Sequence, residues 1–279
     1  MIKYELIPAQ LLHEGTITQE NLFEPTPVDE SVILLTHDKS YWEKLNTQSL
    51  TAKEIRKIGF PMRPALIERG RHITGGTIQC AKYAIQFGVS LNIAGGTHHS
   101  FADHGEGFCI LNDFAIAANY LLKEKLVQKI LIIDLDVHQG NGTAKIFEHN
   151  SSVFTFSMHG AKNYPTKKEY SDLDVEMPDG CDDDTYLSKL RSILPELINE
   201  VCPDFVFYLS GVDVLRTDKL GRLGLSRKGC LERDKFVFET CQAHNIPVAV
   251  SMGGGYSTEI KDIIEAHANT FRAADSIFF

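Results

Sequence analysis

The chain has 279 residues, of which 43% are hydrophobic, and it carries a formal net charge of −9 at pH 7. The negative charge argues against a nucleic-acid surface and no apolar run is long enough to cross a bilayer, so we expect neither a nucleic-acid partner nor a membrane span. Because the sequence contains no linker, low-complexity tract or repeat, we predict one domain spanning residues 1–279.

The start of the chain and the cysteines indicate the compartment. The first residues alternate apolar and polar side chains, which is not the pattern of a signal peptide. The six cysteines lie far apart without a C-x-x-C pair, so we predict buried free thiols and no disulfide or thiolate–metal framework. We therefore expect the cytoplasm, or the nucleus if the organism is eukaryotic.

The first third of the chain predicts few elements. Residues 1–57 give little beyond a predicted strand at Ser31–Thr36. From Pro64 to Phe87 apolar residues recur at roughly helical spacing and Gly88 is a natural C-cap, although two internal glycines argue against one unbroken helix. A strand at Ser90–Ala94 should follow.

The rest of the chain alternates strands with helices. The strands are predicted from Lys129, at Val153–His159, at Asp204–Asp213 and at Ile246–Tyr256. The helices between them are predicted from Asp113 to Leu122, from Gly142 to His149, at Leu187–Val201 and at Lys228–Ala243. We interpret the acidic stretch Asp172–Asp184 as a solvated loop, and the alternative is that its charge steers a lysine-bearing substrate. This alternation predicts an α/β fold with a central, mostly parallel sheet and helices on both faces.

The strand from Lys129 carries the first candidate site residues. It places four apolar residues before Asp134, Asp136 and His138 and stops at Gly140 and Gly142, as a buried parallel strand would. Residues two apart on an extended chain face the same way, so a carboxylate and an imidazole can approach one metal ion. A catalytic zinc keeps three protein ligands and one open position. The alternative is an Asp that caps a helix beside a hydrogen-bonded His.

Other strand ends add to this group, because ligands of parallel α/β sheets bind beyond the carboxyl ends of the strands. Asp213 ends an apolar strand of the same construction and is the candidate third ligand. His98 and His99 follow two glycines at a strand end, and Tyr256 follows three. The plainer interpretation of the two histidines is one surface and one core residue. Ser157 lies on a further strand end.

At this point the sequence resembles the arginase/deacetylase superfamily, and specifically the zinc-dependent histone deacetylases, over residues 58–260. The resemblance implies the arginase/deacetylase fold, one catalytic Zn²⁺ and hydrolysis of an Nε-acyl-lysine amide. It implies zinc ligands at Asp136, His138 and Asp213. It also implies tandem catalytic histidines at His98 and His99.

The resemblance assigns further roles around the zinc. Tyr256 matches the tyrosine that polarises the substrate carbonyl, and Asp134 and Asn141 are also candidate catalytic residues. A structural K⁺ or Na⁺ site is implied at Asp134, Asp136, His138, Ser157 and Met158. The walls of the acyl-lysine tunnel are expected at Gly107, Phe108, Tyr164 and Gly254.

One departure concerns the partner of the second histidine. The larger classes of the family carry His-His-Gly-Asp after the ligand Asp, whereas this chain has His138-Gln-Gly-Asn141. An amide can orient His99 but supplies no charge to favour its imidazolium, so we predict a lower pKa for His99 than in relatives with Asp. The Gln-Gly-Asn sequence, Thr74-Gly-Gly-Thr77 and Gly59-Phe-Pro-Met-Arg-Pro64 are similar to class IV histone deacetylases, which implies a preference for long fatty-acyl lysine.

Three alternatives stay open within this resemblance. The substrate could be an acyl-lysine protein or peptide, or a small amide such as an acetylpolyamine. A dinuclear manganese ureohydrolase of the sister branch would need a carboxylate at the position of Gly140. A binding module that recognises acyl-lysine without cleaving it should lack a ligand or the tyrosine.

Overall fold

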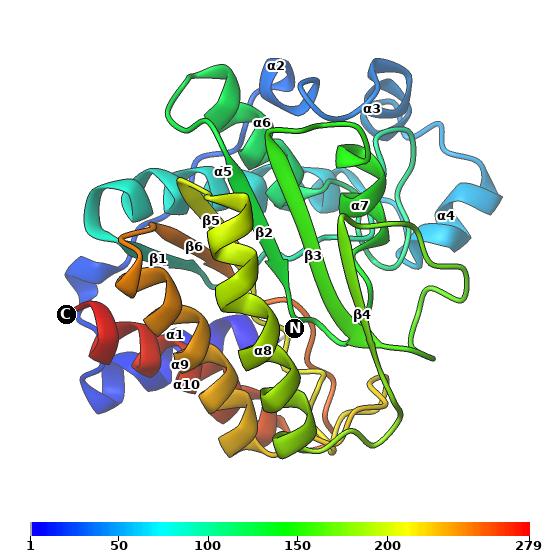
Figure 1. Ribbon diagram of the computed structural model, residues 1–279. Helices are drawn as coiled ribbons and strands as arrows, with labels where there is room; N and C mark the ends of the chain where they lie inside the picture. The colour runs from blue at the N-terminus through cyan, green and yellow to red at the C-terminus, as the bar shows by residue number, and fades with distance from the viewer. Residues whose placement is uncertain (1) are drawn as a thin grey trace.

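The computed structural model describes residues 2–279 and is built around one six-stranded parallel sheet in the order β1-β6-β5-β2-β3-β4 (Figure 1). Met1, with which the predicted domain begins, lies outside the described residues. The strands are β1 (Val89–Asn92), β2 (Ile130–Asp134), β3 (Val153–Gly160), β4 (Leu173–Met177), β5 (Phe205–Leu209) and β6 (Val248–Ser251). All six carboxyl ends therefore point to one edge of the sheet.

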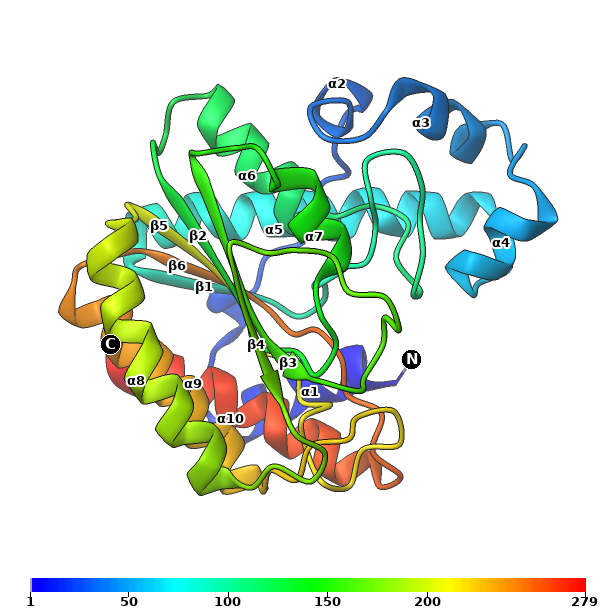
Figure 2. The same cartoon turned by 45° about the vertical axis from the view of Figure 1, so that its right-hand side comes forward.

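Helices cover both faces of the sheet, as the sequence predicts (Figure 2). One face carries α5 (Pro64–Phe87), α6 (Asp113–Lys123) and α7 (Asn141–Phe147). The other carries α8 (Asp183–Val201), α9 (Arg227–Ala243) and α10 (Ile260–Phe278), and α1 (Lys3–Glu14) packs on α10. The remaining elements are η1 (Gln19–Asn21), α2 (Glu30–Ile33), α3 (Lys39–Asn46) and α4 (Ala52–Ile58).

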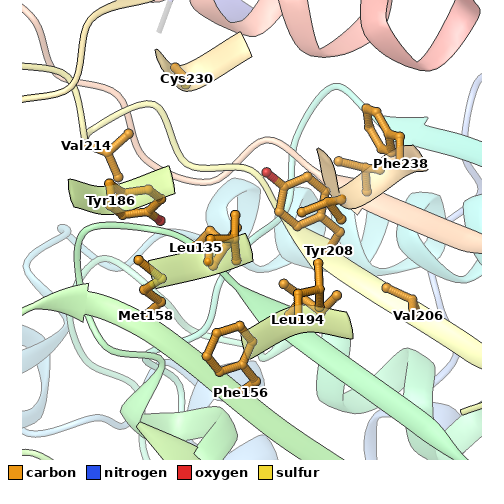
Figure 3. Close-up of a cluster of buried hydrophobic side chains, with 14 of the residues drawn as sticks. Leu135, Phe156, Met158, Tyr186, Leu194, Val206, Tyr208, Val214, Cys230 and Phe238 are labelled. Carbon is orange, nitrogen blue, oxygen red and sulfur yellow. The ribbon is translucent and has the colours of Figure 1, made fainter. Parts of the chain in front are cut away.

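The packing of β2 turns the site residues toward the carboxyl edge. Its alternate side chains enter two cores, Ile130 and Ile132 under α5 and α6, and Leu131 and Ile133 under α8. Leu135 continues the second series and lies in the cluster that Figure 3 shows. Because neighbouring side chains point to opposite sides of an extended chain, burial of Leu135 directs its two aspartate neighbours away from this core.

The helix predicted at Pro64–Phe87 is confirmed as one unbroken helix with these bounds. Its internal glycines do not break it because other segments pack directly against them. A Cβ added to Gly75 would collide with the carbonyl of Thr26, and one added to Gly76 would lie 3.1 Å from the side-chain amide of Asn92. The helix ends where Gly88, with a φ of +91°, donates its N–H to Ala84.

The strand predicted at Ser31–Thr36 is wrong. Residues 30–33 form the short helix α2, and turns follow it. Ile33 is buried in the core beneath α5 and α6, and Asn119 of α6 donates a hydrogen bond to the carbonyl of Leu35 at 3.2 Å. A short apolar run fits a buried helix as well as a strand, so its periodicity could not distinguish them.

The interpretation of Asp172–Asp184 as a solvated loop is also wrong, because it contains the edge strand β4 and the start of α8. Leu173, Val175 and Met177 alternate with acidic residues, which is the pattern of a half-buried strand. The carboxylates here have specific partners. Asp172 accepts a hydrogen bond from the N–H of Thr155 at 2.8 Å.

Two predictions about the whole chain can be compared with the structure. All six cysteines are free thiols, and five are buried. Among residues 2–279, no helix combines the length and the apolar character needed to cross a membrane.

Candidate active site

The three predicted zinc ligands lie together beyond β2 and β5. One donor atom each of Asp136, His138 and Asp213 lies within 4.8 Å of the other two. Backbone bonds hold the group: the N–H of Val137 donates to Oδ1 of Asp213 at 3.0 Å, and that of His138 donates to Oδ1 of Asp136 at 3.0 Å. The strand-end topology therefore brings Asp213 to two residues that precede it by 75 and 77 positions.

The electrostatics of this group favour a cation. Burial, followed by the charge of Asp136, raises the pKa of Asp213 to about 7. Its Oδ2 is buried, accepts no hydrogen bond and faces Nδ1 of His138 at 3.2 Å. Burial alone would lower the pKa of His138, but the two carboxylates raise it to about 10. Two carboxylate oxygens and an imidazole nitrogen are ordinary zinc donors, so these residues fit a zinc ion.

His98 is bound to a carboxylate. Its Nδ1 lies 2.7 Å from Oδ2 of Asp134, and both side chains are almost fully buried. Burial opposes a charge on His98, but Asp134 outweighs it and raises the pKa of this histidine. His98 therefore binds a proton more readily than an ordinary histidine.

His99 is bound to an amide. Its Nδ1 lies 2.7 Å from Oδ1 of Asn141, and its ring lies 4.1 Å from that of His98, centroid to centroid. Burial, followed by the charges of His98 and His138, lowers the pKa of His99 well below its ordinary value. His99 is therefore neutral near pH 7, as a general base must be.

Tyr256 and the three glycines before it lie against the metal donors. The N–H of Gly254 donates to Oδ2 of Asp136 at 2.8 Å, and a Cβ on Gly254 would lie 1.8 Å from Oδ2 of Asp213. The N–H of Tyr256 donates to Asp218 at 2.6 Å. Burial and then Asp213 raise the pKa of the Tyr256 phenol, which keeps its proton. We call residues 134–138, 210–213 and 253–256 the floor of the site.

The residues of the predicted K⁺ or Na⁺ site lie next to one another on β2 and β3. Asp134 pairs with Ser157 in the sheet register, and Met158 is fully buried beside them. Two of the candidate oxygens already have partners. Asp134 Oδ1 accepts from the N–H of Asp136 at 3.1 Å, and the Ser157 hydroxyl lies 2.9 Å from Nδ1 of His159. The ion stays a prediction.

The predicted tunnel residues other than Gly254 form what we call the rim, residues 100–112 together with Tyr164. Phe108 is 50% exposed and packs on Phe60 at 5.0 Å between ring centroids. The ring of Tyr164 stands edge-on to His99 at 5.0 Å. Gly107 lies so close to His99 that a Cβ would come within 2.6 Å of the imidazole. The site thus has an aromatic wall above His99.

Sequence reasoning missed residues that hold the floor and the segment of the two histidines in place. The guanidinium of Arg233, on α9, donates from Nη1 to the carbonyls of Leu135 at 3.1 Å and Gly211 at 2.7 Å. Asp113 accepts from the backbone and hydroxyl of Thr97, just before the two histidines. Neither has a sequence signal, since Arg233 lies within a helix and Asp113 follows an ordinary N-cap residue.

Two more charged residues near the site were also missed. Lys3, on α1, is 5% exposed and donates to the carbonyl of Gly253 at 3.2 Å, and burial lowers its pKa. Glu106, in the rim, is also 5% exposed and accepts a hydrogen bond from Asn141 at 2.7 Å. Both lie in segments whose path the sequence does not reveal.

The chain is similar to several known proteins. The family described as the histone deacetylase domain matches residues 1–271. An uncharacterized protein of Picosynechococcus sp. is 43% identical over 278 residues, which are 100% of this chain and 93% of that protein. Histone deacetylase 2 of Arabidopsis thaliana is 31% identical over 255 residues, 88% of this chain; the chain spans 66% of that relative's length.

A solved structure has the same fold. The crystal structure of a histone deacetylase homologue complexed with SAHA superposes with a TM-score of 0.83 at 25% identity, covering 98% of this chain and 77% of that one.

Proposed function

The chain belongs to the histone deacetylase family and is a hydrolase of the deacetylase type acting on amide bonds, and from this premise we propose that it cleaves the Nε-acyl bond of lysine with one bound Zn²⁺. The observation that carries the proposal is the buried group Asp136, His138 and Asp213, whose donor atoms lie within 4.8 Å of one another. An acyl-lysine on a protein or peptide is the substrate class that we favour over a small amide.

The side chains around the metal donors support a division of labour. A zinc ion held by Asp136, His138 and Asp213 would polarise the amide carbonyl and lower the pKa of water. The neutral His99 is placed to accept a proton, and His98, with its raised pKa, is placed to return one to the leaving amine. The protonated phenol of Tyr256 can donate to the developing oxyanion.

We further propose a class IV enzyme with a preference for long acyl chains. An apolar pocket next to Phe108 supports this preference. Its lining is mostly apolar, with Phe60, Leu66, Gly70, Ile73, Phe108, Ile110 and Leu111, and also includes Arg69 and Thr97. The pocket is small, with a cavity volume of about 30 Å³. A fatty chain that passed the aromatic wall would bury its first methylenes there, at about 0.8 kcal/mol for each, and would have to widen the pocket to bury more.

Three further proposals concern the whole protein. One catalytic domain spans residues 1–279, and a K⁺ or Na⁺ ion stabilises the end of β2 beside Ser157. The protein works in the cytoplasm, a location that the six free thiols support because disulfides are rare there.

The direct experiment combines metal analysis with a substrate panel. Lysine peptides bearing acetyl, octanoyl or myristoyl groups, with an acetylpolyamine beside them, should show hydrolysis of the peptides and fastest turnover of a long chain. Chelation and the His99→Ala variant should each abolish turnover, and SAHA should inhibit it. Faster turnover of the polyamine would overturn the substrate class, and about two equivalents of bound manganese would overturn the single-zinc proposal.

A further inference from the structure

Glu106 is a buried carboxylate at the point where the rim meets the catalytic histidines. One of its oxygens, Oε1, accepts two hydrogen bonds from the inner side, from Nδ2 of Asn141 at 2.7 Å and from the hydroxyl of Tyr164 at 2.6 Å. Each of these two residues also contacts His99, Asn141 through its Oδ1 at 2.7 Å and Tyr164 edge-on at 5.0 Å. One oxygen of Glu106 thus holds two neighbours of the same imidazole.

The other oxygen of Glu106 faces cationic groups on the outer side. Oε2 lies 2.5 Å from the ammonium of Lys57, on α4, and 3.6 Å from Nε2 of His104. Burial alone would raise the pKa of Glu106, but hydrogen bonds from His104, Lys57, Tyr164 and Asn141 outweigh it and hold this pKa well below its ordinary value. Glu106 therefore stays an anion and can only accept hydrogen bonds.

This restriction fixes the orientation of the Asn141 amide. An Asn side chain has a donor end and an acceptor end, and the hydrogen bonds around it decide which way it points. A carboxylate that only accepts must face the NH₂ group. The carbonyl oxygen of Asn141 must then face Nδ1 of His99.

The orientation of the amide in turn fixes the tautomer of His99. A carbonyl oxygen only accepts, so Nδ1 of His99 must carry the proton and donate it. In a neutral imidazole the other nitrogen, Nε2, is then the unprotonated one. If the amide were reversed, its NH₂ would face Nδ1 and the proton would move to Nε2, where a general base needs a lone pair.

We propose that Glu106 is a positioning residue that, through Asn141, sets the base-competent tautomer of His99. The carboxylate that orients this histidine thus contacts Asn141, and Asn141 in turn contacts the imidazole. The tautomer of His99 follows from contacts within this chain. The effect of the tautomer on the rate rests on the proposed function.

The decisive variant is Glu106→Gln, which keeps the shape and removes the charge. The ammonium of Lys57 should attract the carbonyl end of the introduced amide, so the NH₂ end turns toward Asn141 and reverses its amide. We expect kcat to fall about 10- to 100-fold, the usual effect of losing a group that orients a ligand or base, with little change in KM.

A second substitution should restore the activity. A carboxylate at position 141 accepts on both sides, so in Glu106→Gln/Asn141→Asp it can accept from the NH₂ of the introduced glutamine and from the Nδ1–H of His99. We expect kcat to recover about tenfold from Glu106→Gln, which is a coupling energy of ordinary size for contacting residues. In the wild-type background Asn141→Asp should lower kcat, because it places two carboxylates together. A double variant no faster than Glu106→Gln would overturn the proposal.

The tautomer can also be observed without turnover. Long-range ¹H–¹⁵N spectra of the zinc-loaded protein distinguish Nδ1–H from Nε2–H, and a His99→Ala spectrum assigns the signal. We expect Nδ1–H in the wild type and Nε2–H in Glu106→Gln. The same tautomer in both proteins would overturn the proposal even if the wild type hydrolysed no substrate, and a wild type that hydrolysed nothing would by itself overturn only the proposed function.

Glu265→Gln is the matched control. Glu265 accepts from a side-chain amide, that of Gln10 at 2.5 Å, and from a cation, Arg272 at 3.2 Å, as Glu106 does, but on α10. This change should alter neither kcat nor the His99 spectrum. An equal loss of kcat in both variants would show that the effect of Glu106→Gln is not specific to His99.

Discussion

The floor and the rim of the site are built in different ways. Every part of the floor follows the end of a parallel strand, so the sheet itself brings Asp136, His138 and Asp213 together. The rim has no strand of the main sheet beneath it. It is tied by hydrogen bonds to a remote segment: Gly107 to Lys57, Phe108 to Ile58 and Tyr41 to Ile110.

Because of this difference, we expect substitutions in the floor and in the rim to have different effects. The floor is held by buried charges at the ends of the sheet strands, whereas the rim is held by hydrogen bonds to α3 and α4 and by the packing of Ile110 and Leu111 in the core beside those helices. Changes in the floor should therefore remove stability or rate outright, whereas changes in the rim away from Glu106 should alter acid tolerance and substrate preference.

The largest effect should come from Arg233→Met beneath the floor. The substitution leaves Asp234 buried and without its cation and frees two carbonyls of the metal loops, so the free energy of unfolding should fall by about 3–5 kcal/mol. Urea unfolding measures the change. Lys235→Met on the same helix breaks only an exposed pair with Glu232 and should cost at most about 1 kcal/mol. Equal stability of the two variants would contradict the role of Arg233.

The next effect should come from Tyr256→Phe. Loss of one oxyanion donor lowers kcat by about 10²–10³-fold, while the ring and the metal donors stay in place. Steady-state kinetics on an acyl-lysine peptide, with zinc content measured on the same sample, checks this. Close to full turnover in the variant would refute the assignment.

Acid should weaken the attachment of the rim to the rest of the protein, because a protonated His37 can no longer accept a hydrogen bond from it. Its Nε2 accepts the N–H of Asn112 at 3.0 Å, and burial lowers its pKa from 6.5 to about 4. Because the unfolded chain takes up the proton more readily, stability should be constant above about pH 6.5, fall as the pH drops to about 4 and level off below it. The loss from this group is about 3 kcal/mol at most.

Urea unfolding across this range, repeated on His37→Gln, isolates the contribution. The glutamine can accept the same N–H but does not titrate, so its stability should vary less with pH than that of the wild type. Identical slopes between pH 6.5 and 4 would exclude His37 as the sensor.

The smallest effect concerns acyl length. A methyl group added by Gly70→Ala in α5 would lie 3.1 Å from Cδ1 of Ile110, inside the apolar pocket. We expect the ratio of myristoyl to acetyl hydrolysis to fall roughly tenfold, as for one misplaced methylene in a hydrophobic site. An unchanged ratio would show that the acyl chain does not bind in this pocket.

The same contrast explains what the sequence could predict. Asp136, His138 and Asp213 could be grouped because apolar runs predict strands, and the topology of a parallel sheet decides where their ends meet. The contact of Glu106 with Lys57 depends on two irregular segments that no periodicity describes. The wrong strand at Ser31–Thr36 has the same origin, since its apolar run is too short to show a period.

The most direct test of the account is a zinc titration of metal-stripped protein followed by turnover of an acyl-lysine peptide. We predict that activity rises linearly and reaches its plateau at one equivalent of zinc, and that Asp213→Asn shows no such rise. Turnover that is independent of added zinc, or no turnover at any zinc concentration, would contradict the central claim.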